Sequence, residues 1–424
     1  MSRLDLVIFG ATGFTGKKAV EHLAKGGKQY EGVTWGVAGR SQSKLESIMA
    51  EISKIADKDL SAVKIIVADI SDEKSLKDMC SQGKVLVNCC GPYRLYGEPV
   101  VRAAIEAKTH YVDVSGEPQF IETVQLKYSA QARDAGVYII NACGFDSIPN
   151  DMGVIFLQQA LAGGTLNSVE SYMSTYVPPE YQAEARKSGL INYGTWESLV
   201  HSLSHYSELS SLRKQLYPER LPTFKPKLER RPVLHKRDNA WCVPFLGADG
   251  SIVYRTQRTL HEAHGDRPVQ FKVYVQLSNL FYTTLMILAG IVIFLMSKTK
   301  FTRQLLLEHP RLFSGGFVTR QGPKEEVMNN SYFRFDMIGA GWEKGRDVEK
   351  TPPNKEIVAR VSGVNPGYGA TVVALLYSAL TVLREQDKMP QHGVLTTGVA
   401  FRNTNLIKNL NETKELKFEI LEGK

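Results

Sequence analysis

The chain has 424 residues, of which 43% are hydrophobic and 23% charged, and its formal net charge is +8. This composition excludes a disordered chain, and the length is too great for one ordinary core, so we expect more than one domain. The positive charge suits an anionic cofactor, a membrane surface or a nucleic acid and does not choose between them. Five cysteines without paired CxxC motifs predict neither a disulfide framework nor a metal site.

Residues 4–16, LDLVIFGATGFTG, predict a buried parallel strand followed by a glycine turn, and residues 17–25 continue as a helix. A strand, a glycine turn and a helix in this order can bind the pyrophosphate of a dinucleotide against the helix N-terminus. A glycine triplet is also found in ordinary tight turns. The residues predicted to bind the cofactor here are Gly10, Ala11, Thr12, Gly13, Phe14 and Gly16.

A second strand is predicted at 32–40, and it ends in Arg40 and Ser41. This strand end meets the adenosine ribose in a dinucleotide-binding unit, where an acidic residue holds the 2′-hydroxyl and a basic one accommodates a 2′-phosphate. The guanidinium and hydroxyl donors therefore favour NADP(H) over NAD(H). The alternative is that Arg40 is a solvated charge at a strand end.

The next two predicted strands, 64–68 and 85–89, add candidate residues. Asp69 follows the first and could reach the adenine, although capping of the next helix by Asp69 or a neighbour competes with this role. Gly91, Pro92 and Tyr93 follow the second and form a turn over the expected nicotinamide position.

Two more strands are predicted at 110–114 and 136–141. Six strands with interleaved helices indicate an α/β Rossmann fold, a doubly wound parallel sheet, over residues 1–150. Tyr93 is a possible proton donor, and Asp113 and Asp146 lie at neighbouring strand ends, where capping of the local turn is the favoured interpretation. No catalytic residue is assigned.

Residues 151–364 predict a second, largely antiparallel α+β domain that could carry the substrate site or a dimer interface. Its strands are expected at 168–177, 251–262, 269–276, 332–339 and 356–361, and a helix is expected to open at 193–198. Residues 211–239 hold nine Lys or Arg and four prolines, which predicts an exposed basic loop.

Residues 277–296, LSNLFYTTLMILAGIVIFLM, carry no charge and are long enough to cross a bilayer. Strands are predicted on both sides of this segment, so a span would divide one domain across a membrane. Monotopic insertion on the cytosolic side avoids that division and is favoured. A buried helix is the remaining alternative.

Residues 365–424 begin with NPGYGAT and continue into an apolar helix at 369–384. A glycine-punctuated loop at 394–401, a short helix at 404–410 and a final strand or tail at 415–421 are expected to follow. We expect this region to pack back toward the Rossmann domain.

Six motifs together resemble the saccharopine dehydrogenase-like oxidoreductases: GATGFTG (10–16), AGRS (38–41), CCGPYRLYGEPVV (89–101), HYVDVSGE (110–117), ACGFDSIPNDMG (142–153) and NPGYGAT (365–371). That family is similar to bacterial trans-acting enoyl reductases of lipid biosynthesis. The resemblance implies a Rossmann domain, an antiparallel second domain, and a location on lipid droplets or the cytosolic face of an intracellular membrane. It does not imply saccharopine formation, because the charged residues that bind a two-headed amino acid are not matched.

Two functions stay open on the sequence. One is an NADP(H)-dependent oxidoreductase of a lipid or lipid-linked substrate, with reduction of a carbon–carbon double bond and glycolipid biosynthesis among the implied roles. The other is a non-catalytic, nucleotide-binding scaffold on lipid droplets. Neither requires a nucleic acid, and a homodimer is compatible with both.

Overall fold

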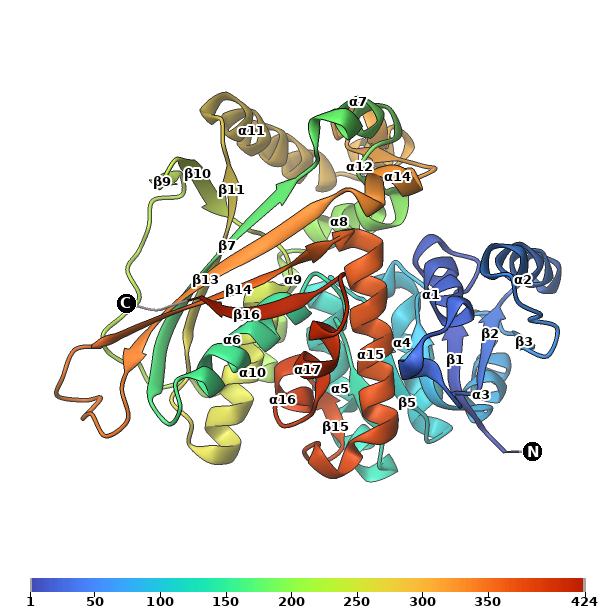
Figure 1. Cartoon of the computed structure of the whole chain (residues 1–424), viewed down its shortest axis with the longest axis horizontal. Coiled ribbons are helices and arrows are strands. Elements are labelled where there is room, and N and C mark those ends of the chain that lie inside the picture. The colour runs from blue at the N-terminus through green and yellow to red at the C-terminus, as the bar shows by residue number, and fades with distance from the viewer. Residues whose placement is uncertain (1, 422–424) are drawn as a thin grey trace.

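The computed structural model describes residues 2–421 and places a parallel seven-stranded sheet at the N-terminal end of the chain (Figure 1). The strand order is β15-β6-β5-β4-β1-β2-β3. The bounds are β1 Leu4–Phe9, β2 Trp35–Gly39, β3 Lys64–Val67, β4 Gly83–Asn88, β5 His110–Asp113, β6 Tyr138–Ile140 and β15 Gly393–Leu395. The prediction of a Rossmann sheet is confirmed.

Alternation along β1 shows why this sheet is buried on both faces. Leu6 and Ile8 belong to one hydrophobic cluster, whereas Val7 and Phe9 belong to another on the opposite face. Helices from the N-terminal third cover both faces, and α15, Thr371–Arg384, joins them on the Leu6 face. The other covering helices are α1 Phe14–Lys25, α2 Gln42–Ala56, α3 Glu73–Ser81, α4 Tyr93–Glu106 and α5 Pro118–Ala135.

The second sheet also has seven strands, in the order β16-β14-β13-β7-β11-β10-β9. It is antiparallel except where β11 runs parallel to β7, so the prediction of a largely antiparallel domain holds. Helix α6, Ile148–Ala160, packs on this sheet and on α10, Asp249–His264. The strands are β7 Thr165–Tyr176, β9 His235–Arg237, β10 Ala240–Pro244, β11 Gln270–Leu277, β13 Tyr332–Trp342, β14 Lys355–Val364 and β16 Lys417–Leu421.

The predicted strand at 251–262 is wrong, because these residues belong to α10. The β-branched and aromatic residues Ile252, Val253, Tyr254 and Thr256 are concentrated there, and these residue types favour strands. The fully buried positions Ile252, Thr256 and Leu260 instead recur every four residues, which is the spacing of a helix face.

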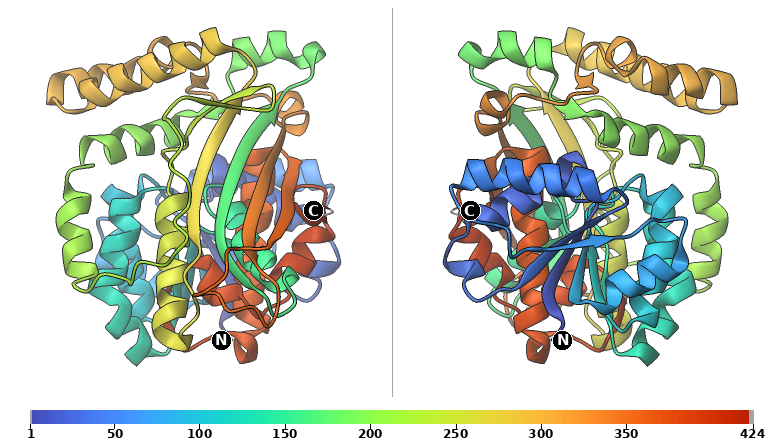
Figure 2. Two further views of the ribbon diagram at one scale, coloured as in Figure 1. Left: turned by 90° about the vertical axis from the view of Figure 1, so that its left-hand side faces the viewer. Right: turned by 90° about the vertical axis from the view of Figure 1, so that its right-hand side faces the viewer.

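The C-terminal region contributes a strand to each large sheet. β15 pairs in parallel with β6, and β16 pairs with β14. The prediction of a loop at 394–401 is therefore wrong. These residues contain most of strand β15 and the whole of helix α16, Thr397–Phe401. Helix α15 contacts both β4 and β5 (Figure 2). Figure 1 shows α15 lying between the two sheets.

The basic segment 211–239 is mainly an exposed loop, as predicted. Its first residues complete α9, Glu208–Leu216, and its last residues form β9. Residues 193–198 open α8, Tyr193–Ser204, which agrees with the expected helix start.

Candidate functional site

The glycine turn between β1 and α1 brings backbone, rather than side chains, to the carboxyl edge of the first sheet. Gly10 has a φ of +80°, which a residue with a side chain adopts only with strain. A Cβ on Gly16 would overlap the Gly10 carbonyl oxygen, so the third glycine permits the close approach of helix to strand. The N-cap residue of α1 is Gly13, which has no side chain, so no side-chain cap within residues 2–421 occupies the first N–H groups of this helix. The free N–H groups and the helix dipole fit a pyrophosphate.

Arg40 and Ser41 follow β2 at the same edge of the sheet. Arg40 is exposed, and its guanidinium is therefore accessible to a 2′-phosphate. The Ser41 hydroxyl accepts a hydrogen bond from the Lys44 N–H at 3.5 Å and so caps α2. The same hydroxyl lies 3.2 Å from the Ser43 hydroxyl, and where Ser43 is the donor of that contact the Ser41 hydrogen can be donated to a phosphate oxygen.

Asp69 lies next to this strand end and does not cap a helix. Its Oδ1 accepts hydrogen bonds from the N–H and the hydroxyl of Ser71, at 2.9 and 2.7 Å. Asp72, the competing residue, caps α3. The Ser71 hydrogen bonds mainly, and the nearby Arg40 charge to a smaller extent, lower the pKa of Asp69. A carboxylate in this position could accept from the adenine amino group through its other oxygen.

The turn after β4 is at the expected edge, but Tyr93 is not available as a proton donor. Gly91 is exposed and Pro92 is the residue before the first turn of α4, whereas the Tyr93 ring is buried against Phe120 at 5.7 Å. The Tyr93 hydroxyl donates to the Asn88 carbonyl at 2.9 Å, and burial raises its pKa well above the usual value. The interpretation of Tyr93 as a proton donor is therefore corrected.

Asp113 has a structural role, which was the favoured interpretation. Its two oxygens accept five hydrogen bonds, from the hydroxyl of Tyr111, the amide of Asn141, the N–H and hydroxyl of Ser115 and the N–H of Ala142. Burial raises the pKa of Asp113, and these donors oppose that shift. The carboxyl group thus ties the ends of β5 and β6 together.

Asp146 differs, because its side chain does not cap the turn in which it lies. Ser147 is the N-cap of α6, and burial is the one cause that raises the pKa of Asp146, with no opposing donor among the described residues. A Cβ on Gly116 would lie 3.0 Å from Asp146 Oδ2, so the glycine keeps space for the carboxyl group. A partly exposed carboxyl with a raised pKa at the carboxyl edge can act as an acid.

The thiols at this edge are not activated nucleophiles. Burial raises the pKa of Cys90, although Arg40 opposes the shift, and it raises the pKa of Cys143 further. Within residues 2–421, no three His, Cys, Asp or Glu side chains gather where they could hold a metal ion.

Residues of the second domain and of the C-terminal region cover the glycine turn, and the sequence reasoning did not identify them. The Tyr368 ring lies 4.5 Å from the Phe14 ring, and its hydroxyl accepts from the Asn192 N–H at 2.6 Å. A Cβ on Gly322 would lie 2.8 Å from the Phe14 ring. The motif NPGYGAT, which contains Tyr368, was the available signal. Asn192 contacts Tyr368 and Gly322 contacts Phe14, but neither residue belongs to a motif that the sequence analysis recognised.

A second contact joins the domains beside the β4 turn. The buried Glu117 carboxylate accepts from the N–H groups of Tyr93 and Arg94, at 2.9 and 2.8 Å, and from the Ser198 hydroxyl at 2.8 Å. Glu117 thereby caps α4 and fixes α8 over the edge of the first sheet.

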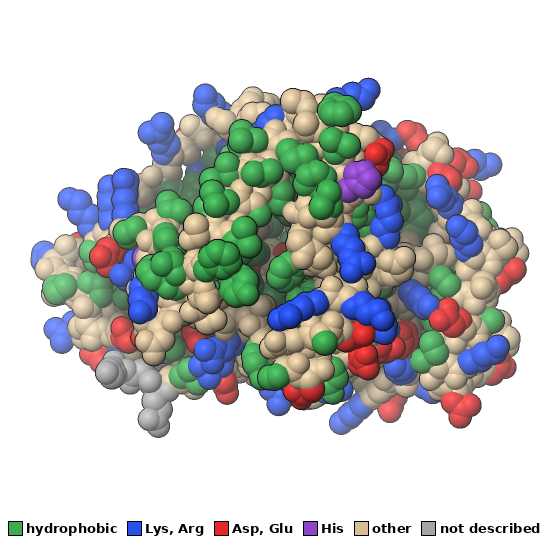
Figure 3. Space-filling model, turned by 90° about the horizontal axis from the view of Figure 1, so that it is seen from above, with side chains coloured by type: hydrophobic (Ala, Val, Ile, Leu, Met, Phe, Trp, Pro, Cys, Tyr) green, Lys and Arg blue, Asp and Glu red, His purple; other side chains and the backbone are tan. Residues whose placement is uncertain are grey.

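Helix α11, Leu280–Ser297, presents an apolar surface at the end of the molecule that lies uppermost in Figure 1. Thr283 and Ser297 are its fully buried residues, whereas Phe281, Leu288 and Leu295 are more than half exposed. The helix packs on α8 and on α12, Lys300–Glu308. Figure 3 shows hydrophobic side chains gathered over this face with Lys and Arg around them. The alternative of a buried helix is wrong.

Within residues 2–421, two helices are apolar and long enough to cross a membrane by length and composition. The helical segment Pro366–Arg384 is 78% buried and is a core helix, whereas only 17% of Leu280–Ser297 is buried.

Comparison with known proteins identifies residues 6–140 as matching the family model "Saccharopine dehydrogenase NADP binding domain". The chain is 40% identical over 416 residues to the mouse protein "Saccharopine dehydrogenase-like oxidoreductase", covering 96% of this chain and 95% of the relative. It is 39% identical to the Caenorhabditis elegans "Lipid droplet localized protein", covering 96% of each. The match to an NADP-binding domain confirms the prediction from Arg40 that the cofactor is NADP(H) rather than NAD(H).

A solved structure shares the fold over the full chain. Saccharopine dehydrogenase (L-Glu forming) from Saccharomyces cerevisiae superposes with a TM-score of 0.52 at 14% identity, and the match covers 99% of this chain and 100% of that one. At this level of identity the comparison concerns architecture alone.

Proposed function

The chain belongs to the saccharopine dehydrogenase-like oxidoreductases, and we propose that it reduces or oxidises a lipid or lipid-linked substrate at a lipid-droplet or membrane surface. Its N-terminal domain is an NADP-binding domain, so the hydride donor or acceptor is NADP(H). The observation that carries the lipid part of the proposal is the outward-facing apolar surface of α11.

The position of α11 in the fold favours insertion along the surface rather than a span. β11 ends just before α11 and β13 follows it in the chain, yet both strands pair with β7 in one sheet. The flanks of α11 therefore lie on the same side of any membrane. Lys298, Lys300 and Arg303 follow the apolar segment at once, where they can contact anionic headgroups.

The site supports the chemistry through binding and orientation. The glycine turn and Arg40 hold the phosphates, while Tyr368 and α8 cover the carboxyl edge of the sheet and limit the access of water. Bound NADP(H) supplies the hydride, as nicotinamide cofactors do. Asp146 offers the protein's own proton at the same edge.

Oxidation of NADPH by the purified full chain, presented with liposomes that contain lipids extracted from droplets, tests the proposal. We expect absorbance at 340 nm to fall only when lipid is present, and mass spectrometry to detect a product two mass units heavier than its precursor. Gly16→Val, in which the helix cannot approach the strand, serves as the cofactor-binding control. Tight NADPH binding without turnover on any lipid class would instead support a nucleotide-binding scaffold.

A further inference from the structure

A cavity of about 1030 Å³ lies away from the glycine turn, between α5, α9, α10 and the basic loop. None of the residues assigned above to the cofactor lines it. Its walls come from both domains, since α5 covers the first sheet and β11 belongs to the second.

The charged residues that line this cavity are mostly basic. Its two acidic residues are Glu219 and Glu122. The guanidinium of Arg213 binds the buried Glu122 carboxylate through both Nε and Nη2, at 2.7 to 3.1 Å, and Ser251 donates to it at 2.6 Å. Glu122 is thus compensated within the protein. The basic residues are Arg213, Lys214, Arg220, Lys227, Arg255 and Arg258.

Nη1 of Arg255 and Nη1 of Arg258 line the cavity and have no well-aligned hydrogen-bond partner among the described residues. The side chains of Tyr217 and Arg255 interact with each other, so the Tyr217 hydroxyl compensates this guanidinium in part. Arg255 is only 2% exposed, and burial lowers its pKa, although Tyr217 and Glu122 oppose that shift. Buried donors are almost always paired in native proteins, since an unpaired charged donor is costly.

The two arginines are held in place by other contacts. Nε of Arg255 donates to Gln125. Arg258 pairs with Glu262 at 2.7 Å, and its guanidinium stacks 4.5 Å over the Tyr217 ring. Their remaining N–H groups are therefore oriented in advance, which lowers the entropic cost of binding a ligand.

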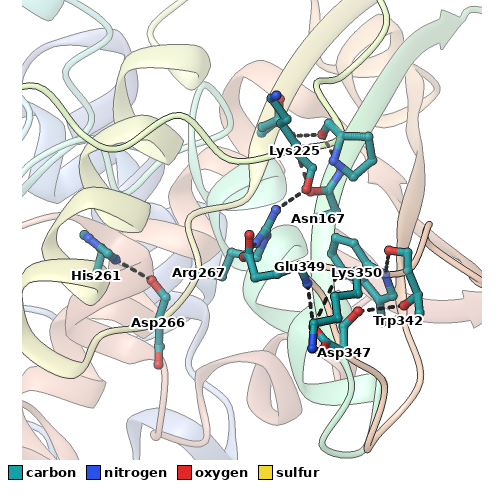
Figure 4. A network of polar contacts seen from close by, with 12 residues as sticks. Asn167, Lys225, His261, Asp266, Arg267, Trp342, Asp347, Glu349 and Lys350 are labelled. Atoms are coloured by element: carbon teal, nitrogen blue, oxygen red, sulfur yellow. Dashed lines mark hydrogen bonds and ion pairs between the residues drawn. The ribbon is translucent and has the colours of Figure 1, made fainter.

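The loop that closes the cavity is anchored rather than loose (Figure 4). Arg267 donates to the Lys225 carbonyl and to Glu349, the latter at 2.8 Å. Asn167 donates to the Pro226 carbonyl at 3.1 Å. The Phe224 ring, which lines the cavity, lies under the Arg267 guanidinium at 4.8 Å.

We propose that this cavity binds a ligand that carries a phosphate group and an apolar part. Guanidinium groups match the oxygens of a phosphate, and four basic residues in excess of the acidic ones suit a multiply charged anion. Tyr254, Phe224 and Tyr217 provide aromatic surface for the apolar part. The site is separate from the one proposed for hydride transfer and does not depend on it.

Calorimetric titration of the full chain tests the proposal, with saturating NADPH present so that the glycine turn and Arg40 are occupied. The probes are inorganic phosphate and dihexanoyl phosphatidic acid below its micelle concentration. We expect binding of the phosphatidic acid, and about tenfold or greater loss of affinity in Arg255→Gln, because a charge-assisted contact is removed. Dihexanoylglycerol, which has the same acyl chains and no phosphate, is the neutral comparison, and equal binding of it would overturn the proposal.

Because Arg255→Gln could destabilise the fold, Lys214→Gln and Lys227→Gln are measured as well. Both lysines are exposed and line the cavity. We expect each substitution to weaken binding severalfold, whereas Arg230→Gln, on the same loop but outside the cavity, leaves it unchanged. Equal effects of all three lysine and arginine substitutions would contradict a defined site.

The two probes separate recognition of the phosphate from recognition of the apolar part. Stronger binding of phosphatidic acid than of inorganic phosphate supports a ligand with an apolar part, whereas equal affinities would show that only the phosphate is recognised and would overturn the apolar half of the proposal. No heat with either probe would overturn the proposal. NADPH oxidation is not measured in this experiment, so its outcome is independent of the proposed hydride-transfer function.

Discussion

The Arg40 guanidinium stands at the end of β2, exposed and close enough to Asp69 to lower the pKa of that carboxyl. Because it can donate to a 2′-phosphate, we expect Arg40→Asp to reduce NADPH affinity by about tenfold or more and to leave NADH affinity less affected. Fluorescence titration of both cofactors gives the ratio. Lys54→Asp makes the same charge change on exposed α2 and serves as the control. An unchanged ratio in Arg40→Asp would contradict the role assigned to this residue.

Asp146 is the acidic group at the carboxyl edge whose side chain the protein does not engage in hydrogen bonds within the described residues. If its protonated form supplies the proton in the reductive direction, the rate falls as the pH rises through its raised pKa. We expect Asp146→Asn to lower kcat by about 10²- to 10⁴-fold and to remove this pH dependence, with NADPH affinity unchanged. A pH profile that Asp146→Asn does not alter would assign the proton to another group.

At the scale of an element, α11 is apolar nearly all round: Ile293 and Met296 pack against a hydrophobic cluster, while most of the remaining apolar side chains are exposed, unlike those of an ordinary surface helix. Leu288 and Ile291 are each about half exposed. Replacement of both by Glu removes apolar burial worth roughly 1.5–3 kcal/mol per side chain, so we expect liposome binding to fall at least tenfold in flotation assays.

A matched control for α11 lies on the opposite domain. Ile55 of α2 is 47% exposed, and Ile55→Glu changes charge and hydrophobicity without touching the α11 surface. We expect it to leave flotation unchanged. Equal loss in both proteins would show that general charge, rather than the α11 surface, determines binding.

At the scale of the whole molecule, the Rossmann sheet depends on residues from the other end of the chain. α15 covers the face that carries Leu6 and Ile8, and β15 adds the edge strand beside β6. We therefore expect residues 1–150 alone to leave this face exposed, to bind the dye ANS and to unfold without a cooperative transition. A sharp thermal transition for this fragment by near-ultraviolet circular dichroism would contradict that dependence.

Local signals were sufficient for much of the fold and for the conformation of the glycine turn. Gly10, Gly13, Gly16 and Arg40 were predicted from spacing and chemistry, since a tight turn and a strand end impose requirements on adjacent residues. The strand predicted at 251–262 was wrong because a short run of β-branched and aromatic residues also occurs in a helix, here one with buried polar residues. Tyr93 was misassigned because only the packed core shows its hydroxyl bonded to Asn88.

The sequence by itself determined the Rossmann fold, the preference for NADP(H) and the presence of an uncharged apolar segment, because each follows from residues close together in the chain. Tertiary structure decided which surface that segment presents, which strand-end carboxyl is engaged and which is free, and how the two domains enclose the basic cavity. Those properties depend on contacts between residues that are far apart in sequence, such as Phe14 with Tyr368 and Glu122 with Arg213. Such pairings leave no local periodicity, and they form only when the chain is packed.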